Sequence, residues 1–222
     1  MHPLLIVLAV ALLGVALVFH FRYVALRREA HIRHAELPKG LFEKLRSRHP
    51  QLSLKDCQLV ANGLRQFFLA HLKSGRKFVA MPSQVVDDLW HEFILCTKNY
   101  DSFCRQGFGR FLHHTPAVVL TDDRMKNAGL RRCWWFACRE EHIDPRAPSR
   151  LPLLFALDAK LNIAGGFSYV PDCGNVRRAD ADSGGTPYCG SDFGSDGVDG
   201  STDGFGDGGS DGGGDGGGCG CG

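Results

Sequence analysis

The chain has 222 residues, enough for one ordinary domain with additional segments. Its formal charge of +2 averages two opposite parts: residues 1–178 carry +11, whereas the residues after Ala179 contain nine Asp and no Lys, Arg or Glu. This excludes a single evenly mixed globule, a collagen-like repeat and a multidomain enzyme of several hundred residues.

The first 26 residues form an apolar segment, in which residues 3–19 contain no charge. At about 1.5 Å per residue, a helix through this segment reaches across the roughly 30 Å hydrocarbon core if Arg22 extends its side chain to the interface. A cleaved signal peptide needs a basic stretch before the apolar run and a small-residue site after it, and the sequence has neither. We therefore expect residues 1–26 to be an uncleaved transmembrane anchor.

Basic residues follow the anchor, and we expect residues 27–49 to be a basic juxtamembrane linker. The positive-inside tendency then predicts a single-pass protein of the inner cell membrane, with its N-terminus outside and the rest cytoplasmic. Anionic lipid head groups are the expected partner of this flank, and its position beside the membrane disfavours nucleic acid. The nine cysteines are expected to remain reduced in the cytoplasm. The basic residues are Arg22, Arg27, Arg28, Arg33 and Lys39.

Residues 50–174 are expected to form a compact, mainly α domain of about five helices. Apolar residues recur at helical spacing, Ser53 and Ser83 are candidate N-caps, and Pro and Gly separate the segments. The segment after the last helix has an extended pattern. The predicted helices cover residues 53–74, 83–97, 100–105, 122–142 and 151–161.

Residues 175–222 form a Gly- and Asp-rich tail that ends in CGCG, and 18 of the 28 glycines lie from Gly184 onward. Such a segment has almost nothing apolar to bury, and its aspartates repel one another, so we expect it to be disordered. Its thiols, Cys219 and Cys221, are candidates for soft-metal capture or thiol exchange. The tail lacks the apolar position of calcium-binding β-helix repeats.

The segment from Met81 to Pro116 carries the candidate site. Asp87 and His91 are four residues apart on a predicted helix, so the carboxylate can orient the imidazole from the second shell of a metal site. Zinc accepts a mixture of Cys and His ligands. The sequence lacks a CxxC pair and a zincin HExxH motif, so packing of these residues in the core stays an alternative. The candidate ligands are His91, Cys96, Cys104, His113 and His114.

Two enzymatic alternatives use the same residues. Zinc-bound water would supply a hydrolytic nucleophile. A thiol enzyme would instead use Cys96 or Cys104 activated by His91 or His113, although no nucleophile signature surrounds either cysteine. The arginines near residue 131 are expected on a solvated helix face: Arg131, Arg132 and Arg139.

The string VDDLWHEF, followed by Tyr100, Phe103-Cys104, Gly109 and His113-His114, resembles the glycine-rich domain-containing protein family, in particular its small bacterial members. The stretch RLPLLFALDAKLNIAGGFSYVPDC is similar to the next segment of those bacterial proteins, so the resemblance covers residues 50–174. It implies a helical domain beside a glycine-rich tail and carries no particular activity. We therefore expect a non-enzymatic binding or scaffolding module that has an unidentified protein partner and can bind a metal. The alternative is a metal-dependent or thiol hydrolase.

Overall fold

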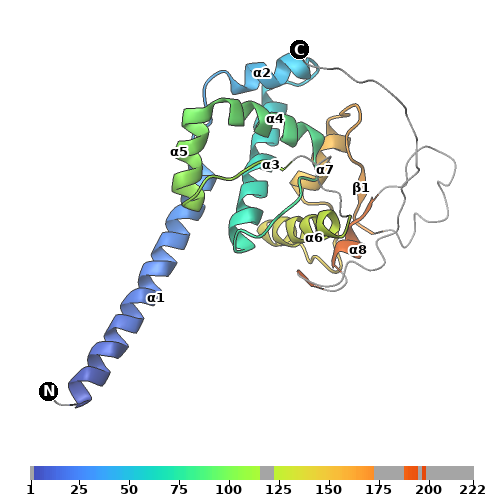
Figure 1. Ribbon diagram of the computed structural model, residues 1–222. Helices are drawn as coiled ribbons and strands as arrows, with labels where there is room; N and C mark the ends of the chain where they lie inside the picture. The colour runs from blue at the N-terminus through green and yellow to red at the C-terminus, as the bar shows by residue number, and fades with distance from the viewer. Residues whose placement is uncertain (1–2, 116–122, 173–187, 195–196, 199–222) are drawn as a thin grey trace, which may run out of the picture.

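The computed structural model describes residues 3–115, 123–172, 188–194 and 197–198. It is mainly helical, as predicted, and Figure 1 shows one long helix extending from a body made of the other elements. The helices are α1 (Pro3–His34), α2 (Leu41–Arg48), α3 (Leu54–Lys73), α4 (Gln84–Leu95), α5 (Thr97–Phe108), α6 (Asp123–Glu140), α7 (Leu153–Lys160) and α8 (Gly190–Gly194). The strands β1 (Tyr169–Val170) and β2 (Tyr188–Cys189) pair in parallel.

Helix α1 extends away from the body with its apolar side chains exposed, including Phe19 and Phe21. Among the described residues, one helix is long and apolar enough to cross a membrane, and it is the Ile6–His34 part of α1. Exposed apolar side chains along a helix need a covering that water does not provide. The N-terminal apolar helix is therefore as predicted.

The predicted linker at residues 27–49 differs from the structure. Helix α1 continues unbroken to His34, and most of the remaining segment forms α2. Both elements pack on the body, because Ile32, Leu41 and Leu45 are fully buried. Leu41 and Leu45 have helical spacing, but α2 has only eight residues and four of them are charged, so its apolar positions do not stand out in the sequence.

Helix α3 is the centre of the body, and α1, α4, α6 and α7 pack against it. It begins at the predicted cap: Ser53 N–H donates to Asp56 Oδ2 at 2.8 Å, and Asp56 N–H donates to Ser53 Oγ at 3.2 Å. Gly63 permits close packing of α7, since a Cβ at this position would lie 2.4 Å from a methyl group of Leu157. The core around α3 is continuous with the aromatic residues of α4 and α5.

The N-terminus of α4 is held by a carboxylate from another helix. Asp158 of α7 is buried, with 2% of its surface exposed. It accepts hydrogen bonds from Ser83 Oγ at 2.7 Å, Gln84 N–H at 2.7 Å and Val85 N–H at 3.2 Å. It also accepts one from Phe167 N–H at 2.9 Å, which fixes the segment leading into β1. The carboxylate therefore satisfies the first amides of α4 and lies at the positive end of its dipole.

Part of the predicted disordered tail is folded. Residues 188–194 form β2 and α8, and Phe193 is buried against Trp134 and Phe155. Gly190 belongs to this packing, since a Cβ there would lie 2.3 Å from the Trp134 ring. The glycines of this stretch let the backbone approach the core closely. Composition alone suggests disorder here and does not reveal this packing. The rest of the tail prediction, including Cys219 and Cys221, lies outside the described residues.

Helix α6 buries residues that were expected at its surface. Arg131, predicted on a solvated face, has 1% of its surface exposed, whereas Arg139 is exposed as predicted. Burial raises the pKa of the Cys133 thiol well above its usual range and that of Cys138 to about 12. Cys189 is disulfide-bonded, which departs from the expectation that all cysteines are reduced.

Replacing the buried carboxylate tests its role at the start of α4. We expect Asp158→Asn to lower the free energy of unfolding by about 3 kcal/mol, because an amide NH₂ in place of one oxygen leaves buried N–H donors without an acceptor. Ser53→Ala, which removes the exposed cap of α3, is expected to cost about 1 kcal/mol. Denaturant unfolding of the detergent-solubilised chain measures both. Equal effects of the two substitutions would contradict a central role for Asp158.

Candidate metal centre

Helix α4 presents Asp87 and His91 one turn apart on the same face. His91 Nδ1 lies 2.9 Å from the backbone oxygen of Asp87 and 3.4 Å from its Oδ2. A neutral His91 that donates its Nδ1 proton to this carbonyl keeps Nε2 unprotonated and available to a ligand. The predicted pairing of these two residues is present in the structure.

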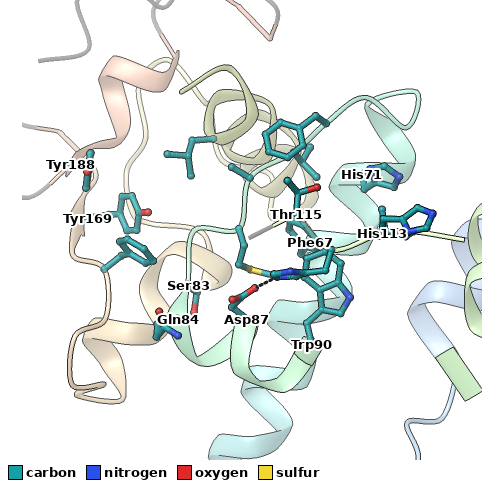
Figure 2. A pocket seen from close by; sticks show the side chains of 18 residues that line it. Phe67, His71, Ser83, Gln84, Asp87, Trp90, His113, Thr115, Tyr169 and Tyr188 are labelled. Atoms are coloured by element: carbon teal, nitrogen blue, oxygen red, sulfur yellow. Dashed lines mark hydrogen bonds and ion pairs between the residues drawn. The ribbon is translucent and has the colours of Figure 1, made fainter. Parts of the chain in front are cut away.

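His114 joins this pair from the segment that follows α5. Its Nε2 lies 2.9 Å from Asp87 Oδ1, the contact marked at Asp87 in Figure 2. The rings of His114 and His91 are 4.2 Å apart between centroids. One ligand atom from each of Asp87, His91 and His114 lies within 4.8 Å of the others. Two imidazoles and one carboxylate therefore converge from two separate parts of the chain.

A buried hydrogen-bond relay fixes the segment that carries His114. Trp90 Nε1–H donates to Tyr100 Oη at 3.1 Å, and the Tyr100 hydroxyl donates to the carbonyl of Leu112 at 2.6 Å. Burial raises the pKa of Tyr100 far above its usual range, so the hydroxyl stays protonated and remains a donor. The rings of Trp90 and His114 also pack edge-to-face, with centroids 4.6 Å apart. The position of His114 is thus determined by residues of α4 and α5.

A cavity of about 140 Å³ opens beside this cluster. In Figure 2, Phe67 and Trp90 lie on one side of Asp87, and Tyr169 and Tyr188 lie on the other. Asp87 is the only carboxylate among the described residues that line the cavity. The cavity is therefore mainly aromatic and apolar, with its charge concentrated at the cluster.

The cluster is partly open to solvent. His114 has 12% and Asp87 23% of its side-chain surface exposed, whereas His91 has 44%. An ion at this place would therefore be bound by three protein groups and keep at least one position for water or a ligand. Such open sites are typical of exchanging or catalytic metal centres, whereas structural zinc sites are closed by four protein ligands.

The structure separates the other predicted ligands from this cluster. Cys104 is fully buried in the core, where burial raises the pKa of its thiol. Cys96 lies at the junction of α4 and α5. His113 lines the cavity, but it is exposed and its ring lies beside Phe111. None of the three belongs to the group of ligand atoms found among the described residues. Asp87, expected to act only from the second shell, belongs to the group itself.

Sequence reasoning missed two residues on which the site depends. Asp158 is more than 70 positions from the amides that it caps, and no local pattern links them. Tyr100 was part of the family resemblance, but its hydrogen bonds follow from the fold. The adjacent candidates His113 and His114 carry no spacing signal that selects His114. The contacts of Tyr100 with Leu112 and of Trp90 with His114 bring the second of the two imidazoles to α4.

His71 of α3 also lines the cavity, and its side chain is buried. Burial lowers the pKa of His71 to about 4, and the nearby positive charges of Arg110 and Arg76 lower it further, while a backbone hydrogen bond at Lys77 opposes them. The folded state therefore holds His71 neutral at pH values where the unfolded chain protonates it.

This difference predicts a loss of stability in acid. Because the pKa of His71 is lower in the folded chain, its contribution is complete above about pH 6.5 and is lost as the pH falls towards 4. Between pH 7.5 and pH 5 we expect His71 to account for about 2 kcal/mol of lost unfolding free energy. Denaturant titrations at both pH values should show a smaller difference for His71→Gln. An unchanged difference in that variant would refute the assignment.

Comparison with known proteins relates this chain to one family. Searches of curated proteins and of solved structures found no match. The resemblance to the glycine-rich domain-containing proteins stays a prediction. A family model named UCP032817-like matches residues 27–193, which spans the end of α1, the whole site and most of α8. The chain therefore belongs to the UCP032817-like family.

Proposed function

We propose that the protein is a membrane-anchored, non-enzymatic binding or scaffolding module that holds a zinc ion between Asp87, His91 and His114. The observation that carries the proposal is the convergence of these three groups within 4.8 Å from two segments of the chain. A protein partner, expected from the sequence, stays a prediction.

The donor set fits a borderline divalent cation. Zinc accepts neutral imidazole nitrogens and carboxylate oxygens at about 2.0–2.2 Å. His114 Nε2 and Asp87 Oδ1 are 2.9 Å apart, so a bound ion would replace the proton that they share. The Asp87 carbonyl that accepts from His91 Nδ1 supplies the outer hydrogen bond that metal-binding histidines commonly have.

The cavity defines the class of molecule that such a module would bind. Its walls are mainly aromatic and apolar, and Figure 2 shows Ser83 and Gln84 beside the metal ligand Asp87. A ligand with an aromatic or aliphatic body and a carboxylate or similar anionic group matches this division. The anionic group would occupy the open position on zinc, and the body would fill the cavity.

A metal-dependent hydrolase is the second candidate, because the open position on zinc would also hold a water molecule. Such enzymes commonly use a further carboxylate as general base. Among the described lining residues only Asp87 carries one, and Glu92 on α4 lies 3.6 Å from Lys44 instead. The thiol alternative is weaker still, since burial raises the pKa of Cys104 and so disfavours its thiolate. These observations support binding over hydrolysis.

Elemental analysis of the purified full-length chain after equilibration with zinc tests the proposal. We expect one zinc ion per chain, and an affinity lowered by more than about 100-fold in His91→Ala and in His114→Ala, because even the loss of an outer-shell partner costs 10–100-fold. His113→Ala is the matched control and should bind zinc normally. Absence of zinc from the unaltered chain, or equal loss in the control, would overturn the proposal. Zinc-dependent cleavage of ester or amide substrates that His114→Ala abolishes would favour the hydrolase.

For the anchor, we propose an inner-membrane location with the N-terminus outside and the domain in the cytoplasm. The excess of Arg and Lys after the apolar segment supports this orientation, and the same flank supports contact with anionic lipid head groups. The disulfide at Cys189 argues for the opposite orientation, because such bonds persist mainly in oxidising compartments.

A membrane-impermeant maleimide applied to intact cells or spheroplasts decides between these orientations. The reagent targets Cys219 and Cys221, and four of the described free thiols are buried. We expect labelling only after the membrane is permeabilised. The Cys219→Ser/Cys221→Ser double variant controls for reaction at other thiols. Labelling of intact cells that this variant loses would place the domain outside the cytoplasm.

A further inference from the structure

Three arginines from distant segments meet at the C-terminal end of α5. Arg76, after α3, donates from Nη1 to the carbonyl of Phe108 at 3.1 Å. Arg110 donates from Nη2 to the carbonyl of Arg76 at 3.1 Å. The guanidinium of Arg28 on α1 lies against Gly109, where an added Cβ would come within 2.4 Å of its Nη2. The fold therefore gathers Arg28, Arg76 and Arg110 into one cluster.

This arginine cluster has no acidic partner among the described residues, which distinguishes it from the neighbouring charges. Arg33, one and a half turns further along α1, pairs with Glu29 and Glu140. Arg76 and Arg110 are exposed, and each donates a hydrogen bond to a backbone carbonyl. Arg76 and Arg110 thus keep most of their guanidinium donors available, and a guanidinium matches the geometry of a phosphate group.

In the proposed insertion, helix α1 also sets the position of this cluster along the membrane normal. From Pro3 to Arg22, α1 rises about 29 Å, which matches the roughly 30 Å hydrocarbon core. Tyr23, exposed and covered by Arg27 at 5.7 Å, is typical of the interface. Arg28 lies about 9 Å beyond Arg22 along the helix, at the level of the lipid head groups. Figure 1 shows the ends of α3 and α5 beside this part of α1.

Backbone features favour the same arrangement. Gly75 and Arg76 both adopt left-handed conformations, with φ of 72° and 62°, and this is costly for an arginine. Gly109 ends α5 in the left-handed region and leaves space for Arg28. Beside Arg110, the ring of Phe111 is 40% exposed, as expected for a side chain that inserts among lipids.

We propose that Arg28, Arg76 and Arg110 form a binding site for the phosphate of an anionic membrane lipid, which holds the domain against the membrane surface. The site rests on the proposed insertion of α1. It differs from a general attraction by the basic flank of residues 22–39, because two of its three arginines, Arg76 and Arg110, lie outside that flank and reach the membrane only through the fold.

Full-length protein in nanodiscs tests this site. Native mass spectrometry would count the lipids retained from mixtures of phosphatidylglycerol and phosphatidylcholine, and hydrogen exchange would follow residues 105–115. We expect one preferentially retained phosphatidylglycerol and slower exchange in discs that contain it. Arg76→Gln/Arg110→Gln should reduce the preference about 30-fold, at about fivefold per arginine. Lys55→Gln/Lys160→Gln, with the same change of charge at the other end of α3, should keep it.

Several outcomes would overturn the lipid site. An equal effect of the two double variants would indicate general electrostatics, and no preference in the unaltered chain would remove the site altogether. The same protection by inorganic phosphate in phosphatidylcholine discs would indicate a free-anion site. Carbonate extraction of cell membranes tests the anchor separately. A chain released by carbonate contradicts both the proposed anchor and the lipid site. A retained chain without lipid preference contradicts only the lipid site. Added salt should weaken the preference without any substitution.

Discussion

The carboxylate of Asp158 joins three parts of the fold at the start of α4. Four donors from the α4 N-terminus and the segment before β1 bind this single buried side chain. A buried carboxylate is costly unless such donors surround it, so the energy of this arrangement depends on all of them together. Asp87 lies in the first turn of α4, and the orientation of the candidate metal centre therefore depends on a helix that contributes no ligand to it.

The two sides of the candidate site are built by different physical means. Helical spacing alone brings Asp87 and His91 together. His114 is positioned by the relay from Trp90 through Tyr100 to Leu112, in which the Tyr100 hydroxyl accepts one hydrogen bond and donates another. The pair of Asp87 and His91 lies on one helix and therefore keeps its geometry when the body moves slightly. The position of His114, in contrast, requires α4 and α5 to keep their packing. Zinc bound across both halves would couple the loop after α5 to the core.

Sequence patterns predicted local features, and the features that they missed depend on contacts between distant segments. The caps at Ser53 and Ser83 and the pairing of Asp87 with His91 follow from spacing, and the structure has all three. Adjacent Asp87 and Asp88 look alike in sequence, yet Asp88 is buried against Arg48 and His49, and only tertiary packing separates their roles. Composition failed in the same way at residues 188–194, where glycines that indicate disorder instead allow Phe193 to enter the core.

The charge of the membrane flank has a similar dependence on the fold. Arg33 pairs with Glu140 of α6, which also accepts from Lys73 of α3 at 2.9 Å. These contacts, with the burial of Ile32, make the end of α1 part of the body and leave little freedom for the domain to turn about the anchor. Positive charges used inside the fold are not free to bind lipids, so the net charge of the flank overstates its attraction. In the proposed insertion of α1, the charges that remain are those that the rigid connection of α1 would place at the level of the lipid head groups. Their positions would then follow from the fold more than from the composition of the flank.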